Sequence, residues 1–355
     1  MIEAAVIGCG RMGAFTSEGV RKFAPECWFP LAHAEAVEAA EGLDLVALCD
    51  PHEQGLARTA ERYGVTRTYT DHRAMLAEGV PDLVGIATRT IGRTDIIADC
   101  FEAGVRAFHI EKPICNSVAE LRSLEEIFAR DDVFVSLGAV RRHFAIYREA
   151  VARASSGDYG ALLEARVDMG SGPLLWTHPH SVDLILLAAA GREVQSVQAR
   201  LGEVERDGST IVNDPAILAA SIWFEGDFAG HINRAYGNDF HLSCERARFA
   251  VANDGHSLTV AAADDANPYP ETQQVAFDAG DAPQGTLAPI LQLKACLGGD
   301  TEARSANAAL KRDIIRGQAI LFAFVQSHLN GGTPVALADI DCDMMIEGRT
   351  GQFYA

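Results

Sequence analysis

The chain has 355 residues, of which 48% are hydrophobic and 22% charged, a composition typical of a globular protein with about two domains. Acidic residues outnumber basic ones by 49 to 30, and the formal net charge of −19 argues against binding to nucleic acid or to an anionic membrane surface. No apolar run approaches the roughly 20 residues that span a bilayer, and no basic stretch precedes an apolar one at the N-terminus, so we expect neither a membrane segment nor a signal peptide.

The first predicted element is a strand that leads into a glycine turn. Apolar residues precede Gly8, and Gly10 and Gly13 complete a G-x-G-x-x-G spacing. In dinucleotide-binding domains these glycines allow a tight turn, close approach of a pyrophosphate and close packing of the following helix. The free N–H groups and the positive dipole end of that helix favour the phosphates. The predicted cofactor-binding residues of this turn are Gly8, Gly10, Arg11, Met12 and Gly13.

A second strand, predicted over residues 43–50, ends in Asp50. A carboxylate in this place accepts the ribose hydroxyls of NAD and repels the 2′-phosphate of NADP, so Asp50 predicts NAD as the cofactor. Asp50 lies farther from Gly13 than the usual spacing of about 20 residues. Segment 21–33, which contains two prolines, explains the excess as a loop inserted after the first helix. The alternative for Asp50 is an ordinary turn residue at a strand end.

Helices and strands continue to alternate after Asp50. Helices are predicted over 53–64, 71–79 and 94–104, with Gly64 and Gly104 as the stops of the first and third and Asp71 as the N-cap of the second. Strands are predicted over 66–70, 82–90 and 106–110. Five strands with crossover helices predict a doubly wound parallel sheet, in which ligands bind at the carboxyl ends of the strands. Thr88 ends the fourth strand, and Glu111 and Lys112 follow the fifth, so all three are expected at the cofactor rim. A surface ion pair at a strand end is the alternative for Glu111 and Lys112.

The order of these motifs resembles the Gfo/Idh/MocA family of oxidoreductases. Members carry G-x-G-x-x-G, an acidic or basic residue after the second strand, Glu-Lys-Pro after the fifth strand, and a later helix of the D-x-G-x-H-x-x-D type. Here GCGRMG, Asp50 and EKP match, and WTHPHSVD at 176–183 matches in part. The resemblance covers essentially the whole chain. It implies an α/β protein with a Rossmann domain over 1–122 and an α+β domain over 123–355, which carries a large open, mostly antiparallel sheet for substrate binding and oligomerisation.

The resemblance also implies roles for individual residues. Lys112 faces the reacting hydroxyl, its bond to the following proline is often cis, and Glu111 lies near the nicotinamide ribose. His180 matches the family histidine that takes the proton, and Asp183 matches the trailing carboxylate. Trp176 stands where the family has an aspartate, so an aromatic wall against a sugar ring replaces a carboxylate, or Trp176 belongs to the core.

The residues around His180 predict a helix that begins after Thr177 as N-cap, holds Pro179 in its first turn and ends at Gly191. His180 and Asp183 are three residues apart and share one face of this helix. In the first turn the helix dipole disfavours a charged imidazole, which suits a neutral base.

Four arginines follow strand ends near the rim and are candidates for binding a carboxylate or phosphate of the substrate, or are solvated: Arg89, Arg93, Arg141 and Arg142. No metal is expected, because His178 and His180 point away from each other on a helix and no cysteine cluster is present. Strand-like segments between residues 162 and 263 predict a wide, mostly antiparallel sheet. Since few helices follow to cover it, we expect a homodimer or homotetramer. The eight scattered cysteines, without a CxxC pair, favour a cytoplasmic location.

These features together predict an NAD-dependent dehydrogenase acting on CH–OH groups. It would transfer a hydride from a secondary hydroxyl of a sugar, polyol or sugar derivative to the nicotinamide, with Lys112 and His180 handling the proton. Two alternatives stay open: a redox-neutral sugar-modifying enzyme that retains its NAD, and a non-catalytic regulator that binds NAD.

Overall fold

The computed structural model describes residues 1–264 and 266–348, and the chain divides into two compact units. The first unit comprises Met1–Val140 and Pro283–Ile315. The second comprises Arg141–Ala282 and the described residues from Arg316 onward. This division differs from the predicted boundary after residue 122, which falls inside helix α6 (Val118–Phe128) of the first unit.

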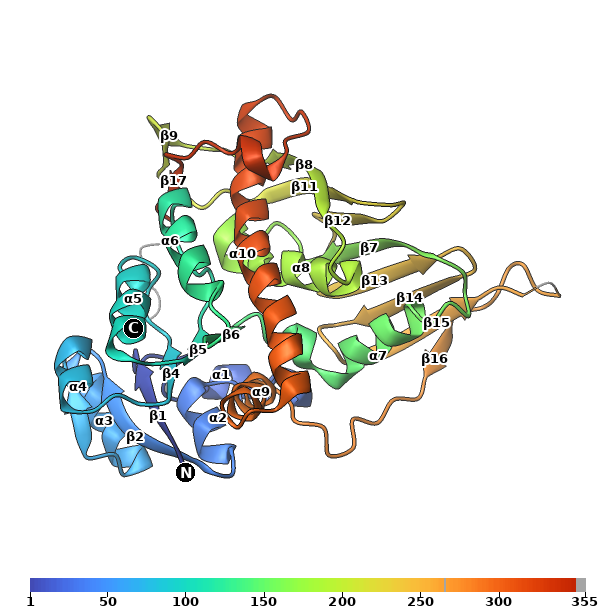
Figure 1. Cartoon of the computed structure of the whole chain (residues 1–355). Coiled ribbons are helices and arrows are strands. Elements are labelled where there is room, and N and C mark those ends of the chain that lie inside the picture. Colours follow the sequence, from blue (N-terminus) through green and yellow to red (C-terminus); the bar gives the residue numbers. More distant parts are fainter. Residues whose placement is uncertain (265, 349–355) are drawn as a thin grey trace. The chain divides into compact units, whose positions relative to one another are not determined.

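The first unit is built on a six-stranded parallel sheet with the order β3-β2-β1-β4-β5-β6 (Figure 1). Its strands are β1 (Ile2–Ile7), β2 (Leu43–Cys49), β3 (Arg67–Tyr69), β4 (Leu83–Ile86), β5 (Ala107–Ile110) and β6 (Phe134–Leu137). The doubly wound sheet is confirmed, but the prediction of five strands was one short, because β6 lies in the segment assigned to the second domain. The strand order reverses between β1 and β4, so the carboxyl ends of these strands flank the crevice where such sheets bind ligands.

The helices of the first unit before residue 140 begin and end at local sequence signals. They are α1 (Glu18–Arg21), η1 (Glu26–Trp28), α2 (His33–Ala39), α3 (Glu53–Tyr63), α4 (His72–Glu78), α5 (Arg93–Ala103) and α6. Gly64 and Gly104 end α3 and α5 in the left-handed region, where glycine is favoured. The Asp71 side chain accepts from the Ala74 N–H at 3.2 Å and caps α4. These caps were predicted from the sequence.

The helix predicted to open at Gly13 is interrupted. Residues 11–14 form a single turn, and α1 is a separate helix of four residues. The His33 N–H at the start of α2 donates to the Met12 carbonyl at 2.8 Å, so α2 continues the helix that the glycine turn begins. Residues 15–32 are therefore an insertion within the first helix. An inserted loop was predicted, but its expected place after that helix was wrong.

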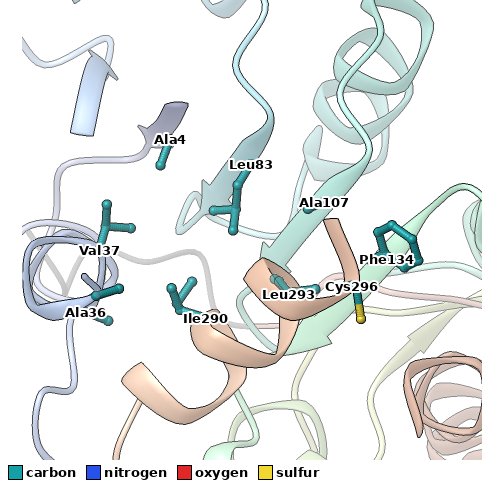
Figure 2. Close-up of a cluster of buried hydrophobic side chains, with 10 residues drawn as sticks. Ala4, Ala36, Val37, Leu83, Ala107, Phe134, Ile290, Leu293 and Cys296 are labelled. Carbon is teal, nitrogen blue, oxygen red and sulfur yellow. The ribbon is translucent and has the colours of Figure 1, made fainter. Parts of the chain in front are cut away.

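A helix from far along the chain completes the first unit. α9 (Leu287–Leu297) packs against β5, β6 and α2. Figure 2 shows its buried Ile290, Leu293 and Cys296 against Leu83 of β4 and Val37 of α2. The first unit therefore owes part of its hydrophobic core to residues that follow most of the second unit in the chain.

The first turns of α10 (Thr301–Leu329) cover the edge strand β6. The Asn307 Oδ1 accepts from the Val135 N–H at 3.1 Å, and its Nδ2 donates to the Val135 carbonyl at 2.8 Å. One amide side chain thus pairs with the strand edge as a neighbouring strand would, which blunts an exposed edge. Across residues 1–264 and 266–348, no helix is long and apolar enough to cross a membrane.

The second unit contains a mixed, mostly antiparallel sheet of eight strands with the order β16-β15-β14-β13-β7-β12-β11-β8. The strands are β7 (Leu162–Asp168), β8 (Val194–Leu201), β11 (Ile217–Phe224), β12 (Ala229–Asn233), β13 (Asp239–Cys244), β14 (Ala247–Ala252), β15 (Ser257–Ala262) and β16 (Gln273–Val275). A small sheet joins β9 (Arg206–Asp207), β10 (Thr210–Ile211) and β17 (Met345–Ile346), and single 3-10 turns are η2 (Val140–His143) and η3 (Leu337–Asp339). The predicted large, mostly antiparallel sheet is confirmed.

Helices α7 (Ala145–Ala154) and α8 (Leu174–Ala189) cover one face of this sheet. The Tyr147 ring of α7 lies 6.0 Å from the Phe240 ring, and a Cβ on Gly230 would lie 2.3 Å from a methyl of Ile185 in α8. The residues that alternate with this buried face are half-exposed, among them Arg166 and His241. We call this second side, on β7 and β11–β15, the open face.

Candidate functional site

The glycine turn is shaped by two close approaches and one open position. Gly8 has φ +98°, and a Cβ on Gly13 would lie 1.7 Å from the Gly8 carbonyl oxygen. Neither position tolerates a larger residue without a shift of the backbone. A Cβ on Gly10, in contrast, would meet none of the described residues within 4 Å, its two chain neighbours aside. The backbone at Gly10 is thus accessible to a pyrophosphate, as in dinucleotide-binding turns.

Asp50 lies directly beside this turn. Its Oδ2 accepts from the Cys9 N–H at 2.6 Å, and its Oδ1 accepts from the His52 N–H at 2.7 Å. Each carboxylate oxygen has a second lone pair, so the side chain keeps acceptor capacity for ribose hydroxyls. Holding Cys9 inside the glycine turn is a second role for Asp50, which sequence reasoning missed.

Thr88 faces the same turn from the end of β4. A Cβ on Gly8 would lie 2.9 Å from the Thr88 nitrogen, so the two segments are in contact. The Thr88 Oγ1 is buried and has no hydrogen-bond partner among the described residues. Buried hydroxyls normally have a hydrogen-bond partner, so a bound polar ligand would account for this one at the rim. With Gly10 and Asp50, it fits the dinucleotide predicted from the sequence.

The Glu111-Lys112-Pro113 turn follows β5, and its Lys112–Pro113 bond is cis. The Glu111 carboxylate points inward, with Oε1 3.3 Å from Nε2 of His33, the first residue of α2. Burial alone would raise the pKa of Glu111, but the hydrogen bond to His33 and the charges of His33, Lys112 and Arg93 lower it below its ordinary value. Glu111 thus holds the start of α2, while its predicted place near the nicotinamide ribose remains a prediction.

Helix α8 begins earlier than predicted. Its first residue is Leu174 and its N-cap is Pro173, so Pro179 lies inside the helix and Thr177 is not the N-cap. His180 consequently lies in the second turn, and the prediction that the helix dipole keeps it neutral from the first turn was wrong. The periodic apolar pattern did not distinguish the two starts, because the residues from 174 on are also apolar.

The N-terminus of α8 is capped from a distant segment. The N–H groups of Leu175 and Trp176 donate to the two carboxylate oxygens of Asp214, at 2.8 and 3.1 Å. This carboxylate satisfies two of the backbone donors that a helix start leaves without partners. No local sequence signal pointed to Asp214, since it lies 38 positions beyond Trp176.

Trp176, His180 and Asp183 share one face of α8, spaced by four and three residues. Trp176 is 37% exposed, His180 is half-buried and Asp183 is buried. The Asp183 carboxylate forms an ion pair with Arg142, at 3.0 Å from Nε to Oδ1. Arg142 also donates to the Asp183 carbonyl at 3.2 Å, so two predicted site residues hold each other.

The predicted site residues divide between the units. The glycine turn, Asp50, Thr88, exposed Arg89, Glu111 and Lys112 belong to the first unit, and Arg142, Trp176, His180 and Asp183 belong to the second. The structure therefore groups the predicted cofactor residues with one another, and the predicted proton-handling histidine with its aspartate.

His178 is part of the interior and not of the exposed face. Its Nε2 donates to the Gly172 carbonyl at 3.1 Å, which leaves Nδ1 to accept from the Ser181 hydroxyl at 3.0 Å. Burial lowers the pKa of His178 to about 4, so the ring is neutral near pH 7. These bonds give His178 a structural role.

The comparison with protein families agrees with this arrangement. Residues 2–139 match the model of the GFO_IDH_MocA oxidoreductase family, described as having an NAD-binding Rossmann fold. This part of the chain is similar to the NAD-binding domain of that family, in agreement with the resemblance found in the sequence.

Curated relatives match part of the chain. A D-apiose dehydrogenase of Paraburkholderia graminis is 29% identical over 122 residues, which are 34% of this chain and 28% of that protein. A scyllo-inositol 2-dehydrogenase (NAD(+)) of Bacillus subtilis is 26% identical over 159 residues, which are 45% of this chain and 42% of that protein. The chain thus spans less than half the length of either relative.

A solved structure matches almost the whole chain in fold. The inositol dehydrogenase homolog of Azotobacter vinelandii, complexed with NADH and myo-inositol, superposes with a TM-score of 0.72 at 16% identity. The match covers 94% of this chain and 97% of that one. At this identity the similarity establishes the common fold.

Asp50 should make the protein prefer NAD to NADP. We expect a difference in binding free energy on the order of 1–3 kcal/mol, the range of a hydrogen bond to a charged group. Asp50→Asn should narrow this difference, whereas Glu53→Gln, which removes a charge three residues further along at the start of α3, should not. Fluorescence titrations at fixed ionic strength measure the affinity of the unmodified protein and of each variant for NAD and for NADP. Equal affinity of the unmodified protein for NAD and NADP would contradict the assigned role.

His178 should make the second unit less stable in mild acid. Its pKa falls from 6.5 in the unfolded chain to about 4 in the fold, so the unfolded state takes up the proton first as the pH decreases. The free energy of unfolding should therefore drop below pH 6.5, by about 2 kcal/mol at pH 5. Urea unfolding at pH 7 and pH 5 should show a smaller drop for His178→Gln, but an unchanged one for exposed His256→Gln. Equal drops in all three proteins would refute this.

Proposed function

We propose that the protein is an NAD-dependent oxidoreductase that oxidises a secondary hydroxyl of a sugar, polyol or sugar derivative. One observation carries the proposal: the rim with Gly10, Asp50 and a Thr88 hydroxyl that no described residue binds also carries Lys112, a group able to contact a reacting oxygen. The activities named for the two curated relatives, on apiose and on inositol, support this substrate class.

The chain's own residues would bind the dinucleotide and handle the proton. Gly10 and the turn around it would hold the pyrophosphate, and Asp50 the adenosine ribose. NAD, when bound, supplies the acceptor for the hydride of the substrate carbon. Lys112 would donate a hydrogen bond to the substrate oxygen and polarise it, and His180 would accept the hydroxyl proton.

Other residues of the second unit would shape the substrate site. Half-exposed Trp176 would stack on the apolar face of a sugar ring. Asp183 would orient His180 or receive a hydroxyl. Because Arg142 forms an ion pair with Asp183, we assign Arg142 to holding Asp183 and not to binding an acidic group of the substrate. Exposed Arg89 is the alternative for binding such a group. No metal takes part in this scheme.

Lys112→Ala and His180→Ala should each lower turnover about 10²–10⁴-fold, the usual contribution of a placed acid or base, while NAD affinity changes little. Because both would act on one oxygen, the double variant should lose far less than the product of the single losses. Turnover is measured as NADH absorbance across a panel of sugars and polyols at saturating substrate, and NAD binding separately by calorimetry.

Matched controls come from the same units. Exposed Lys22→Ala and exposed His256→Ala should leave turnover unchanged. If Lys112→Ala mainly weakened NAD binding, the Glu111-Lys112-Pro113 turn would be a cofactor clamp and not part of the chemistry. Tightly retained NAD with sugar conversion but no NADH release would favour the redox-neutral alternative. NAD binding without turnover of the whole panel would favour a regulator.

We further propose that two or four copies assemble through the open face, in the cytoplasm. Half-exposed side chains continue in register across that face, from Ser221 through His231, Arg166 and His241 to Ala250. A wide sheet face with this degree of exposure is suited to burial against a second copy. The eight cysteines are free thiols, in keeping with a reducing compartment.

Light scattering at micromolar concentration should give two or four times the chain mass of 38.0 kDa. Ala250→Arg should shift the protein to monomers, because it places a bulky charge on the open face. Ser155→Arg, at an exposed site after α7, is the control and should keep the oligomer. A monomeric unmodified protein would exclude the proposed assembly.

A further inference from the structure

Arg93 is buried, although its place after a strand end suggested a solvated residue or a ligand for an acidic group of the substrate. It is the first residue of α5, yet only 2% of it is exposed. Its guanidinium donates to three backbone carbonyls, those of Thr88, Glu111 and Pro113. Thr88 follows β4, and the other two residues follow β5. One side chain therefore joins the carboxyl ends of two neighbouring strands at the cofactor rim.

The burial of Arg93 carries a physical cost. A buried charge is destabilising unless it is paired and hydrogen-bonded. Burial lowers the pKa of Arg93 to about 10, against the opposing charge of Glu111, so the side chain remains charged near pH 7. Its Nε is buried without a hydrogen-bond partner among the described residues. An apolar residue would avoid this cost but would leave three inward-facing carbonyls without their donor.

Two of the three bonds go to the residues on either side of Lys112 in the chain. The Glu111 carbonyl is on one side of it and the Pro113 carbonyl on the other, and Arg93 holds both. The Glu111 side chain is fixed as well, since it contacts His33 and would lie 2.6 Å from a Cβ on Gly138. Glu111 and Pro113 are buried, whereas Lys112 is half-exposed. The backbone that carries Lys112 is thus fixed from both flanks.

We propose that Arg93 is a positioning residue that sets where the Lys112 amine stands relative to Thr88, by tying the ends of β4 and β5 together. The planar guanidinium presents five N–H donors in a fixed fork and reaches three carbonyls at once, which a lysine ammonium on its flexible stem does not match. The tie itself is independent of the proposed function. Its consequence for turnover rests on that function, through the role of Lys112.

The lysine content of the chain allows a direct test. The whole sequence contains four lysines, Lys22, Lys112, Lys294 and Lys311. Trace acetylation with acetic anhydride between pH 6 and 10, read by peptide mass spectrometry, gives the reactivity of each amine in the unmodified protein. The other three lysines serve as internal references, and Lys112→Arg identifies the Lys112 peptide.

Arg93→Lys keeps the charge but loses the fork, and Arg93→Met loses both. Each should change the pH profile of Lys112 acetylation by about threefold or more at a given pH, since amine reactivity follows the local charges and hydrogen bonds. The three reference lysines should react as before. Arg106→Met is the matched control: Arg106 precedes β5 and donates to the Phe101 and Val105 carbonyls at 2.9 and 2.8 Å. It should leave Lys112 unchanged.

Arg93→Ala should regain the original Lys112 profile when guanidinium ions are added at low millimolar concentration, which a merely destabilised protein would not do. An unchanged Lys112 profile in Arg93→Lys overturns the proposal, because a charge effect without positioning predicts that result. Should Arg93→Met not fold, Arg93→Lys alone decides. If Arg93→Lys alters Lys112 while Lys112→Ala leaves turnover intact, the proposed function fails and the positioning role stands.

Discussion

The site depends on one close approach, that of the glycine turn to the end of β4. Gly13 packs on the Gly8 carbonyl, and Gly8 in turn contacts the Ala87–Thr88 peptide, so neither position accepts a Cβ. This contact fixes β1 beside β4 at the point where the strand order reverses, which is where doubly wound sheets bind their ligands. Asp50, through the Cys9 N–H, and Arg93, through the Thr88 carbonyl, each add a tie to this contact. The cofactor rim is therefore preorganised by backbone contacts and not by exposed side chains.

Two further segments of the first unit support this rim. The insertion 15–32 leaves and re-enters the first helix, and Glu35 of α2 closes it by accepting from the Thr16 N–H and hydroxyl at 3.0 and 2.6 Å. α9 then packs beneath β4 and β5 after the chain has completed most of the second unit. A Cβ on Gly285 would lie 2.3 Å from the Pro30 carbonyl oxygen, so the insertion and the segment entering α9 are fitted to each other. The described part of the first unit thus folds from two separate stretches of the chain, Met1–Val140 and Pro283–Ile315.

The parts of the fold that sequence reasoning predicted are those with local signals. Gly64 and Gly104 as helix ends, Asp71 as a cap and the glycine turn all act within a few residues of themselves. What it missed depends on distant partners. β6 and α9 were assigned to the other unit because their apolar residues say nothing about which sheet they join. The start of α8 was misplaced because its cap, Asp214, comes from another segment. The roles of the site residues at the rim remain predictions for the same reason, since they concern a ligand.

The arginines near the rim show how a charge near a strand end can mislead. From the sequence, an arginine in such a place suggests a ligand for an acidic substrate. In the fold, Arg93 donates to backbone carbonyls and Arg142 pairs with Asp183. Arg141 pairs with Asp254 through two hydrogen bonds of 2.5 and 2.7 Å. These guanidiniums stabilise the segments that follow β4, β5 and β6, and most of their donors are used within the chain itself. Under the proposed function, hydrogen bonds and Trp176 would recognise a neutral sugar or polyol, and Arg89 would be left for an acidic group; a neutral substrate is consistent with a chain of net charge −19.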